Sequence, residues 1–175
     1  GGNDTVRFLL SGSAETSEQY EDGDGNDFAQ QQDLYIKSNP TAKGMAYLPG
    51  KRDMDAYEKK TLMAKLFWNI TDNQELRLSY TGNRSDDVLY PNTPMDADYD
   101  DSDIYTVEYT AKDLGEYSKK LSLNLYRSEV DHPMSNRNRK SVLAKGEITH
   151  HLQTEMQGAK LKNEFDIDNH ALAVG

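Results

Sequence analysis

The sequence predicts an all-β fold in which about seven antiparallel strands form part of a transmembrane β-barrel. Apolar and polar residues alternate with period two in several segments, as they do in strands whose two faces meet different surroundings. Short polar turns alternate with long loops along the chain, a pattern typical of outer-membrane barrels. No segment approaches the roughly 18 apolar residues of a transmembrane helix, and a barrel strand has to be apolar only toward lipid.

The N-terminal part is expected to contain one strand and one long loop. Residues 5–13 alternate in polarity and predict the first strand. Residues 28–57 have no clean periodicity and are interrupted by prolines and glycines, which indicates a long loop. A short strand around residues 34–36 fits within this loop.

Four strands are predicted in the middle of the chain, at residues 58–71, 75–81, 105–110 and 121–126. Residues 72–74 are polar and predict a tight turn between the first two. Each of these strands carries one apolar and one polar face, so together they predict a sheet with two different surfaces.

Long loops are expected at residues 91–103 and 131–141, because proline and acidic residues break the alternation there. Two more strands are predicted at residues 158–167 and 171–174, joined by a turn at Asp168–Asn169.

The alternation assigns residues to a lipid-facing surface and to an interior surface. The lipid-facing residues are Leu62, Leu66, Trp68, Ile70, Leu76, Leu78, Leu121, Leu123 and Leu125. The interior residues are Arg7, Lys65, Asn69, Arg77, Ser79, Ser122 and Asn124. A small soluble β-sandwich would alternate in the same way, so it stays open as an alternative. The unequal loop lengths favour the barrel.

Length and composition narrow the possible functions. The chain has 175 residues, enough for one domain, and carries a net charge of −10 from 30 acidic and 20 basic residues. A nucleic-acid partner is not expected, because it requires a basic surface. There is no cysteine, so the chain cannot form disulfides or thiolate zinc sites. The Gly-Gly start and the strand-like end suggest that residues 1–175 are one part of a longer protein.

Several segments resemble TonB-dependent outer-membrane receptors. Val88–Asp96 and Tyr99–Asp103 resemble the loop that follows an early barrel strand in this family, and Glu164–Gly175 resembles a hairpin near the middle of these barrels. Val130–Asn136 is similar to an Asp-His-x-Met-Asp-Asn stretch of the subfamily that includes the TonB-dependent copper receptors.

The resemblance implies a barrel of about 22 strands that is plugged by an N-terminal globular domain. The chain would then be roughly the first third of the barrel, without the plug domain. The whole protein would reside in the cell outer membrane, contact its lipid, and import a scarce nutrient when TonB acts on the plug.

The resemblance also implies a copper site at His132 and Met134, with Pro133 between them. Imidazole nitrogen and thioether sulfur together suit Cu(I), because soft donors select a soft cation. Met95 is a further candidate ligand, and the plug would supply others. Two alternatives remain: His132 and Met134 pack against the plug without a metal, or the cargo is a ferric siderophore bound by aromatic and basic loop residues.

A function of another class is a soluble, calcium-binding extracellular β-module. Residues 22–27 match the start of a calcium loop, but Asp27 replaces the expected glycine and Asp33 the expected glutamate. His150 and His151 are adjacent, so on a strand they would point to opposite faces and would not share an ion. The sequence contains no recognisable nucleophile motif, so we do not expect enzyme activity.

Overall fold

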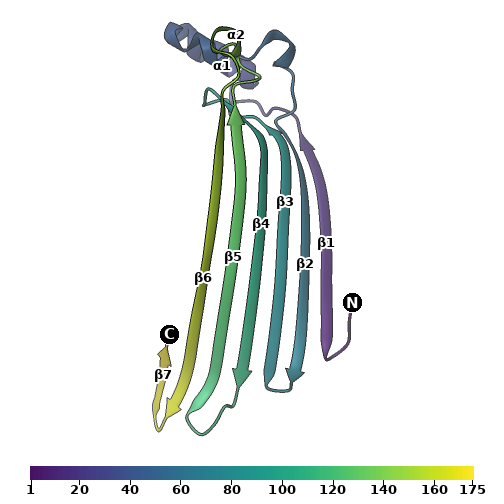
Figure 1. Cartoon of the computed structure of the whole chain (residues 1–175), viewed down its shortest axis with the longest axis vertical. Coiled ribbons are helices and arrows are strands. Elements are labelled where there is room, and N and C mark those ends of the chain that lie inside the picture. The colour runs from purple at the N-terminus through teal and green to yellow at the C-terminus, as the bar shows by residue number, and fades with distance from the viewer.

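One seven-stranded antiparallel sheet forms the body of the molecule, and all helices gather at one end of it (Figure 1). The computed structural model describes residues 1–175. The strands are β1 (Val6–Ser17), β2 (Tyr57–Thr71), β3 (Gln74–Val88), β4 (Asp96–Lys112), β5 (Ser118–Ser135), β6 (Thr149–Ile167) and β7 (His170–Val174). They lie side by side in chain order, which confirms the prediction of an all-β antiparallel fold with about seven strands. β1 and β7 do not pair with each other, so the sheet is open.

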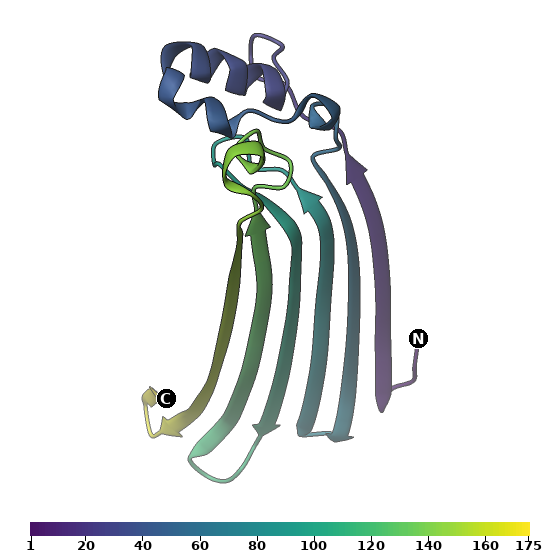
Figure 2. The same cartoon turned by 45° about the horizontal axis from the view of Figure 1, so that its top comes forward.

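Short and long connections lie at opposite ends of the sheet. Asp72–Asn73 joins β2 to β3, residues 113–117 join β4 to β5, and Asp168–Asn169 joins β6 to β7. The connections at the other end are residues 18–56, 89–95 and 136–148. These three segments fold together above the strands, and we call them the loop cap. Figure 2 shows the cap from a second direction, over a sheet that curves along its length.

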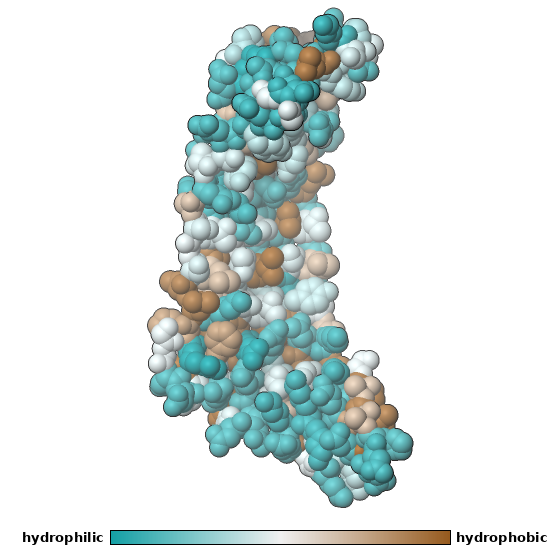
Figure 3. Space-filling model, turned by 180° about the vertical axis from the view of Figure 1, so that it is seen from behind, coloured by the Kyte–Doolittle hydropathy of each residue, from teal (hydrophilic) through white to brown (hydrophobic).

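The strand register confirms the two predicted faces. One rung of the apolar face runs across six strands through Phe8, Leu66, Leu78, Val107, Leu125 and Ala159. A rung of the polar face runs through Arg7, Phe67, Arg77, Glu108, Asn124 and Lys160. In this rung the exception is Phe67, whose ring lies 5.6 Å from the Arg7 guanidinium carbon and 5.7 Å from that of Arg77. Hydrophilic side chains crowd both ends of the molecule (Figure 3).

No second layer covers the apolar face, so the sandwich alternative is wrong. Only 17 of the 175 residues are buried, and most of the buried hydrophobic ones belong to the loop cap rather than the sheet. Apolar side chains on the sheet remain open to their surroundings: Leu10 is 67% exposed and Phe8 58% exposed. A sandwich of this size would instead bury one face of each sheet.

The prediction of a structureless segment at residues 28–57 is wrong, and so is the short strand at 34–36. The segment contains helix α1 (Phe28–Ser38) and two 3-10 turns, η1 (Pro40–Met45) and η2 (Pro49–Lys51). Asp27 caps α1, since its carboxylate accepts from the Gln30 backbone while the Gln30 side chain accepts from the Asp27 backbone. No helix of the structure has the length and apolar character needed to cross a membrane.

The strands also extend further toward the cap than predicted. β4 begins at Asp96 and β5 continues to Ser135, within segments expected to be loops. β6 begins at Thr149, preceded by the short helix α2 (Val142–Lys145). Backbone pairing continues there although the side chains are polar, because ladder hydrogen bonds do not require an apolar face. The alternation therefore marks only the apolar part of each strand.

Candidate functional site

His132 and Met134 lie on the polar face of β5, near its cap end. The register places even-numbered residues of β5 on this face, together with Asn124. The segment therefore belongs to a strand rather than to the loop that the sequence predicts. The two side chains are two residues apart on one strand, so both leave the sheet on the same side.

A β-bulge in β4 shapes the surroundings of His132. Ala97 pairs with Met134 and Asp101 pairs with Asp131, so three residues of β4 face only two of β5. One of those two is Pro133, which has no N–H to donate to the ladder. Bulges of this kind re-aim side chains, and here Asp100 from the bulge reaches His132.

Asp100 lies beside the imidazole ring of His132. Nδ1 of His132 lies 3.3 Å from a carboxylate oxygen of Asp100, and the His132 side chain is 18% exposed. The ring of Tyr90 meets the ring of His132 edge to face, with centroids 5.8 Å apart. A proton on Nδ1 toward Asp100 leaves the lone pair of Nε2 free to bind a metal.

Met134 has two different neighbours across the sheet. Ala97 of β4 lies on one side and His150 of β6 on the other. The prediction that His150 and His151 point to opposite faces is confirmed, since His151 pairs with Pro133. That His150 pairs with Met134 could not be predicted from sequence periodicity, because the register between β5 and β6 depends on the loop that joins them.

Met95, the other predicted ligand, lies in the connection 89–95 and is half-buried. Its backbone carbonyl accepts from the Thr93 hydroxyl. The residue that pairs with Met134 is Ala97, two positions further on. The structure therefore brings His132 and Met134 together on one strand and leaves Met95 in the loop cap.

The acidic segment at residues 22–27 closes on itself. One carboxylate oxygen of Asp22 accepts from the backbone N–H groups of Asp24 and Asn26 and from the Asn26 side chain. These bonds lower the pKa of Asp22. The oxygens of the residue that would begin a calcium loop are therefore already engaged. Nowhere in the chain do three or more His, Asp or Glu side chains gather in a way that would hold a metal ion.

The loop cap is organised around Arg139, which sequence reasoning missed. Its side chain is fully buried and forms an ion pair with the equally buried Asp96. Nε donates to Asp96 Oδ2 over 2.8 Å, and the other nitrogens reach the carbonyl oxygens of Met45 and Tyr90 at 3.0 Å each. The guanidinium carbon lies 4.0 Å from the centre of the Tyr47 ring. One side chain thus connects all three segments of the cap.

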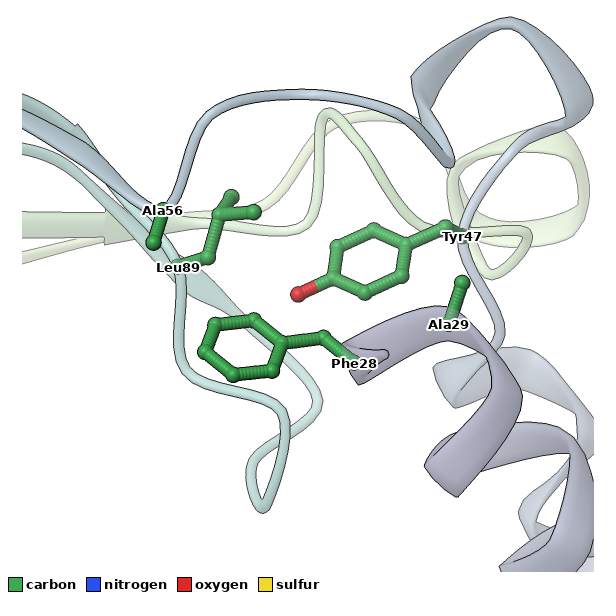
Figure 4. Close-up of a cluster of buried hydrophobic side chains, with 5 residues drawn as sticks. All are labelled: Phe28, Ala29, Tyr47, Ala56 and Leu89. Carbon is green, nitrogen blue, oxygen red and sulfur yellow. The ribbon is translucent and has the colours of Figure 1, made fainter. Parts of the chain in front are cut away.

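Tyr47 contacts Arg139 and Asp96 and also belongs to a small hydrophobic core. Its ring packs with Phe28, Ala29, Ala56 and Leu89 (Figure 4). Its hydroxyl donates to Asp96 over 3.3 Å. Burial, reinforced by the Asp96 carboxylate, raises the pKa of Tyr47 far above its usual value. The hydroxyl therefore remains a hydrogen-bond donor throughout the physiological pH range.

Comparisons with known proteins support the architecture. No protein-family model and no curated protein matches the chain. Among the solved structures that match is one described as "Copper transporter OprC", with a TM-score of 0.74 and 16% sequence identity. The match covers 98% of this chain and 24% of the other, so the chain spans about a quarter of that protein. At this identity the likeness establishes the fold: the open sheet matches a fragment of a larger barrel.

Proposed function

We propose that the chain is part of the β-barrel of a TonB-dependent outer-membrane receptor that imports copper. The observation that carries the copper assignment is the pair His132 and Met134 on the polar face of β5. Asp100 lies beside Nδ1 of His132, so Nε2 would be the metal donor, and Met134 leaves the sheet on the same face two residues along β5. A nitrogen and a soft sulfur on one surface suit Cu(I) better than a hard cation.

The uncovered apolar face supports a position in the membrane. It extends across six strands without a second protein layer, and lipid is the surrounding that would cover it. A span of the bilayer needs about 9–11 tilted residues, so strands of 15–19 residues would project beyond the membrane at the cap end. The loop cap would then lie outside the cell.

In this proposal the polar face lines the barrel interior and meets the plug domain, which lies outside this chain. TonB would act on the plug and release the ion inward. A soluble calcium-binding module fits less well, because an isolated single sheet would expose its apolar face to water. The Asp22 oxygens are also occupied by hydrogen bonds of their own loop.

The test is a Cu(I) titration of the complete receptor, in which a chromogenic chelator competes for the ion under reducing conditions. We expect Met134→Ala to weaken Cu(I) binding at least about tenfold, since even indirect partners of a metal ligand contribute that much. Met156→Ala is the matched control. It removes the same side chain from the polar face of β6, opposite Ser128 and away from the site, so binding should be unchanged.

Failure of the wild-type receptor to bind Cu(I), or equal binding by wild type and Met134→Ala, would refute the copper assignment. A ferric chelate would then be the cargo to examine. The barrel assignment does not depend on this result, because it rests on the strand register and the uncovered apolar face.

A further inference from the structure

We propose that His150 is a third copper donor, so that the sheet alone offers two imidazoles and one thioether to the ion. This inference rests on the proposed function, because it adds a residue to the same site. Neither the sequence motif nor the likeness in fold points to His150. The strand register does.

The register places His150 directly opposite Met134, on the same face of the sheet. Side chains of such a cross-strand pair have Cβ atoms about 4.5–5.5 Å apart. His132 lies two residues from Met134 on β5, and its own cross-strand partner is Leu152, two residues from His150 on β6. His132, Met134 and His150 thus occupy three corners of one square of the ladder, with Leu152 at the fourth.

The other side of Met134 offers no competing donor. Its partner on β4 is Ala97, which is buried and has no functional group. His150 is exposed, so its ring is accessible from the space over the polar face. Strand side chains stand roughly perpendicular to the sheet. An ion above Met134 is therefore flanked by imidazoles of two neighbouring strands.

The donor set suits Cu(I) in particular. Imidazole binds several transition metals, whereas the thioether of Met134 favours a soft monovalent ion. Three donors from β5 and β6 would hold the ion on the barrel wall with fewer contributions from the plug.

The experiment compares His150→Ala with His151→Ala in the complete receptor, again by Cu(I) titration against a competing chelator. His151 is the matched control, because it is the adjacent residue but pairs with Pro133 on the opposite face. We expect His150→Ala to weaken binding at least about tenfold and His151→Ala to leave it unchanged. His150→Met, which replaces the imidazole with a thioether donor, should retain most of the affinity. X-ray absorption of the copper complex should show one imidazole fewer in His150→Ala.

The outcomes separate the two proposals. If Met134→Ala weakens binding while His150→Ala binds as tightly as wild type, the third donor is refuted and the copper receptor stands. Equal losses of Cu(I) affinity in His150→Ala and His151→Ala would also refute the third donor, because the two side chains lie on opposite faces of the sheet. If the wild-type receptor binds no Cu(I), both proposals fail.

Discussion

Replacing Arg139 with methionine should destabilise the loop cap by about 3–5 kcal/mol, the usual cost of removing one partner from a buried ion pair. Asp96 would remain as an uncompensated buried charge, and the Met45 and Tyr90 carbonyls would lose the hydrogen bonds from the guanidinium. Hydrogen exchange should detect the change, because amides that join the cap segments would exchange faster. Two such amides are Leu48 N, bonded to Asn138 O, and Lys140 N, bonded to Ala46 O.

Arg137→Met is the matched control for this prediction. Arg137 lies two residues away and also pairs with aspartates, Asp87 and Asp98, but its side chain is 40% exposed. An exposed pair of this kind contributes about 0–1 kcal/mol, so exchange in the cap should hardly change. Similar exchange rates in the two variants would show that Arg139 does not organise the cap.

A second substitution separates the buried charge from the lost contacts. Adding Asp96→Asn to Arg139→Met removes the uncompensated carboxylate and keeps a side chain that can still bond to the Tyr47 hydroxyl. We expect the double variant to be more stable than Arg139→Met alone, because the unpaired charge accounts for much of the loss. If the double variant is less stable than Arg139→Met alone, the missing hydrogen bonds rather than the unpaired charge account for the loss.

The sheet could be predicted from the sequence because each apolar strand segment carries its own period-two pattern. Leu62 to Ile70 and Leu121 to Leu125 identify both the strand and the side that is apolar. Two of the three short turns followed from their Asp-Asn pairs, Asp72–Asn73 and Asp168–Asn169. Only local information is needed for these features, so a single sequence suffices.

The cap ends of the strands and the loop cap could not be predicted in the same way. In β4 and β5 the alternation stops before the strand does, because both faces are polar there. The cap depends on contacts between residues far apart in sequence, such as Asp96 with Arg139. The capping box at Asp27 and Gln30 was a local sign of α1 that could have been recognised.

Part of the candidate site could be predicted, because side chains on a strand alternate between its two faces. His132 and Met134 are two residues apart, so their common face follows from the strand period once the strand is known. Asp100 and His150 come to the site through the bulge in β4 and the register of β6. Both depend on how neighbouring strands align, which local sequence does not determine.

The proposed lipid-facing role of the apolar surface predicts that Leu123→Arg will impair the barrel by about 2–4 kcal/mol, the cost of an arginine near the bilayer midplane. Leu123 is the middle of three leucines on the apolar face of β5, and its cross-strand partners are Tyr109 and Leu161. No acidic residue lies directly opposite to compensate the charge. The measurement is the urea unfolding free energy of the complete receptor in lipid vesicles, together with the yield of folded protein in the outer membrane.

Asn124→Arg provides the comparison that makes this result specific to the apolar face. Asn124 is the next residue along β5 but belongs to the polar face, where its side chain donates to Glu108. An arginine there would meet that carboxylate and water rather than lipid, so the loss should be small. If both variants lost the same stability, the membrane would not be distinguishing the two faces. A large loss in Leu123→Arg alone would mean that the apolar face is the one in contact with lipid, and the face that carries His132, Met134 and His150 would then be directed into the barrel.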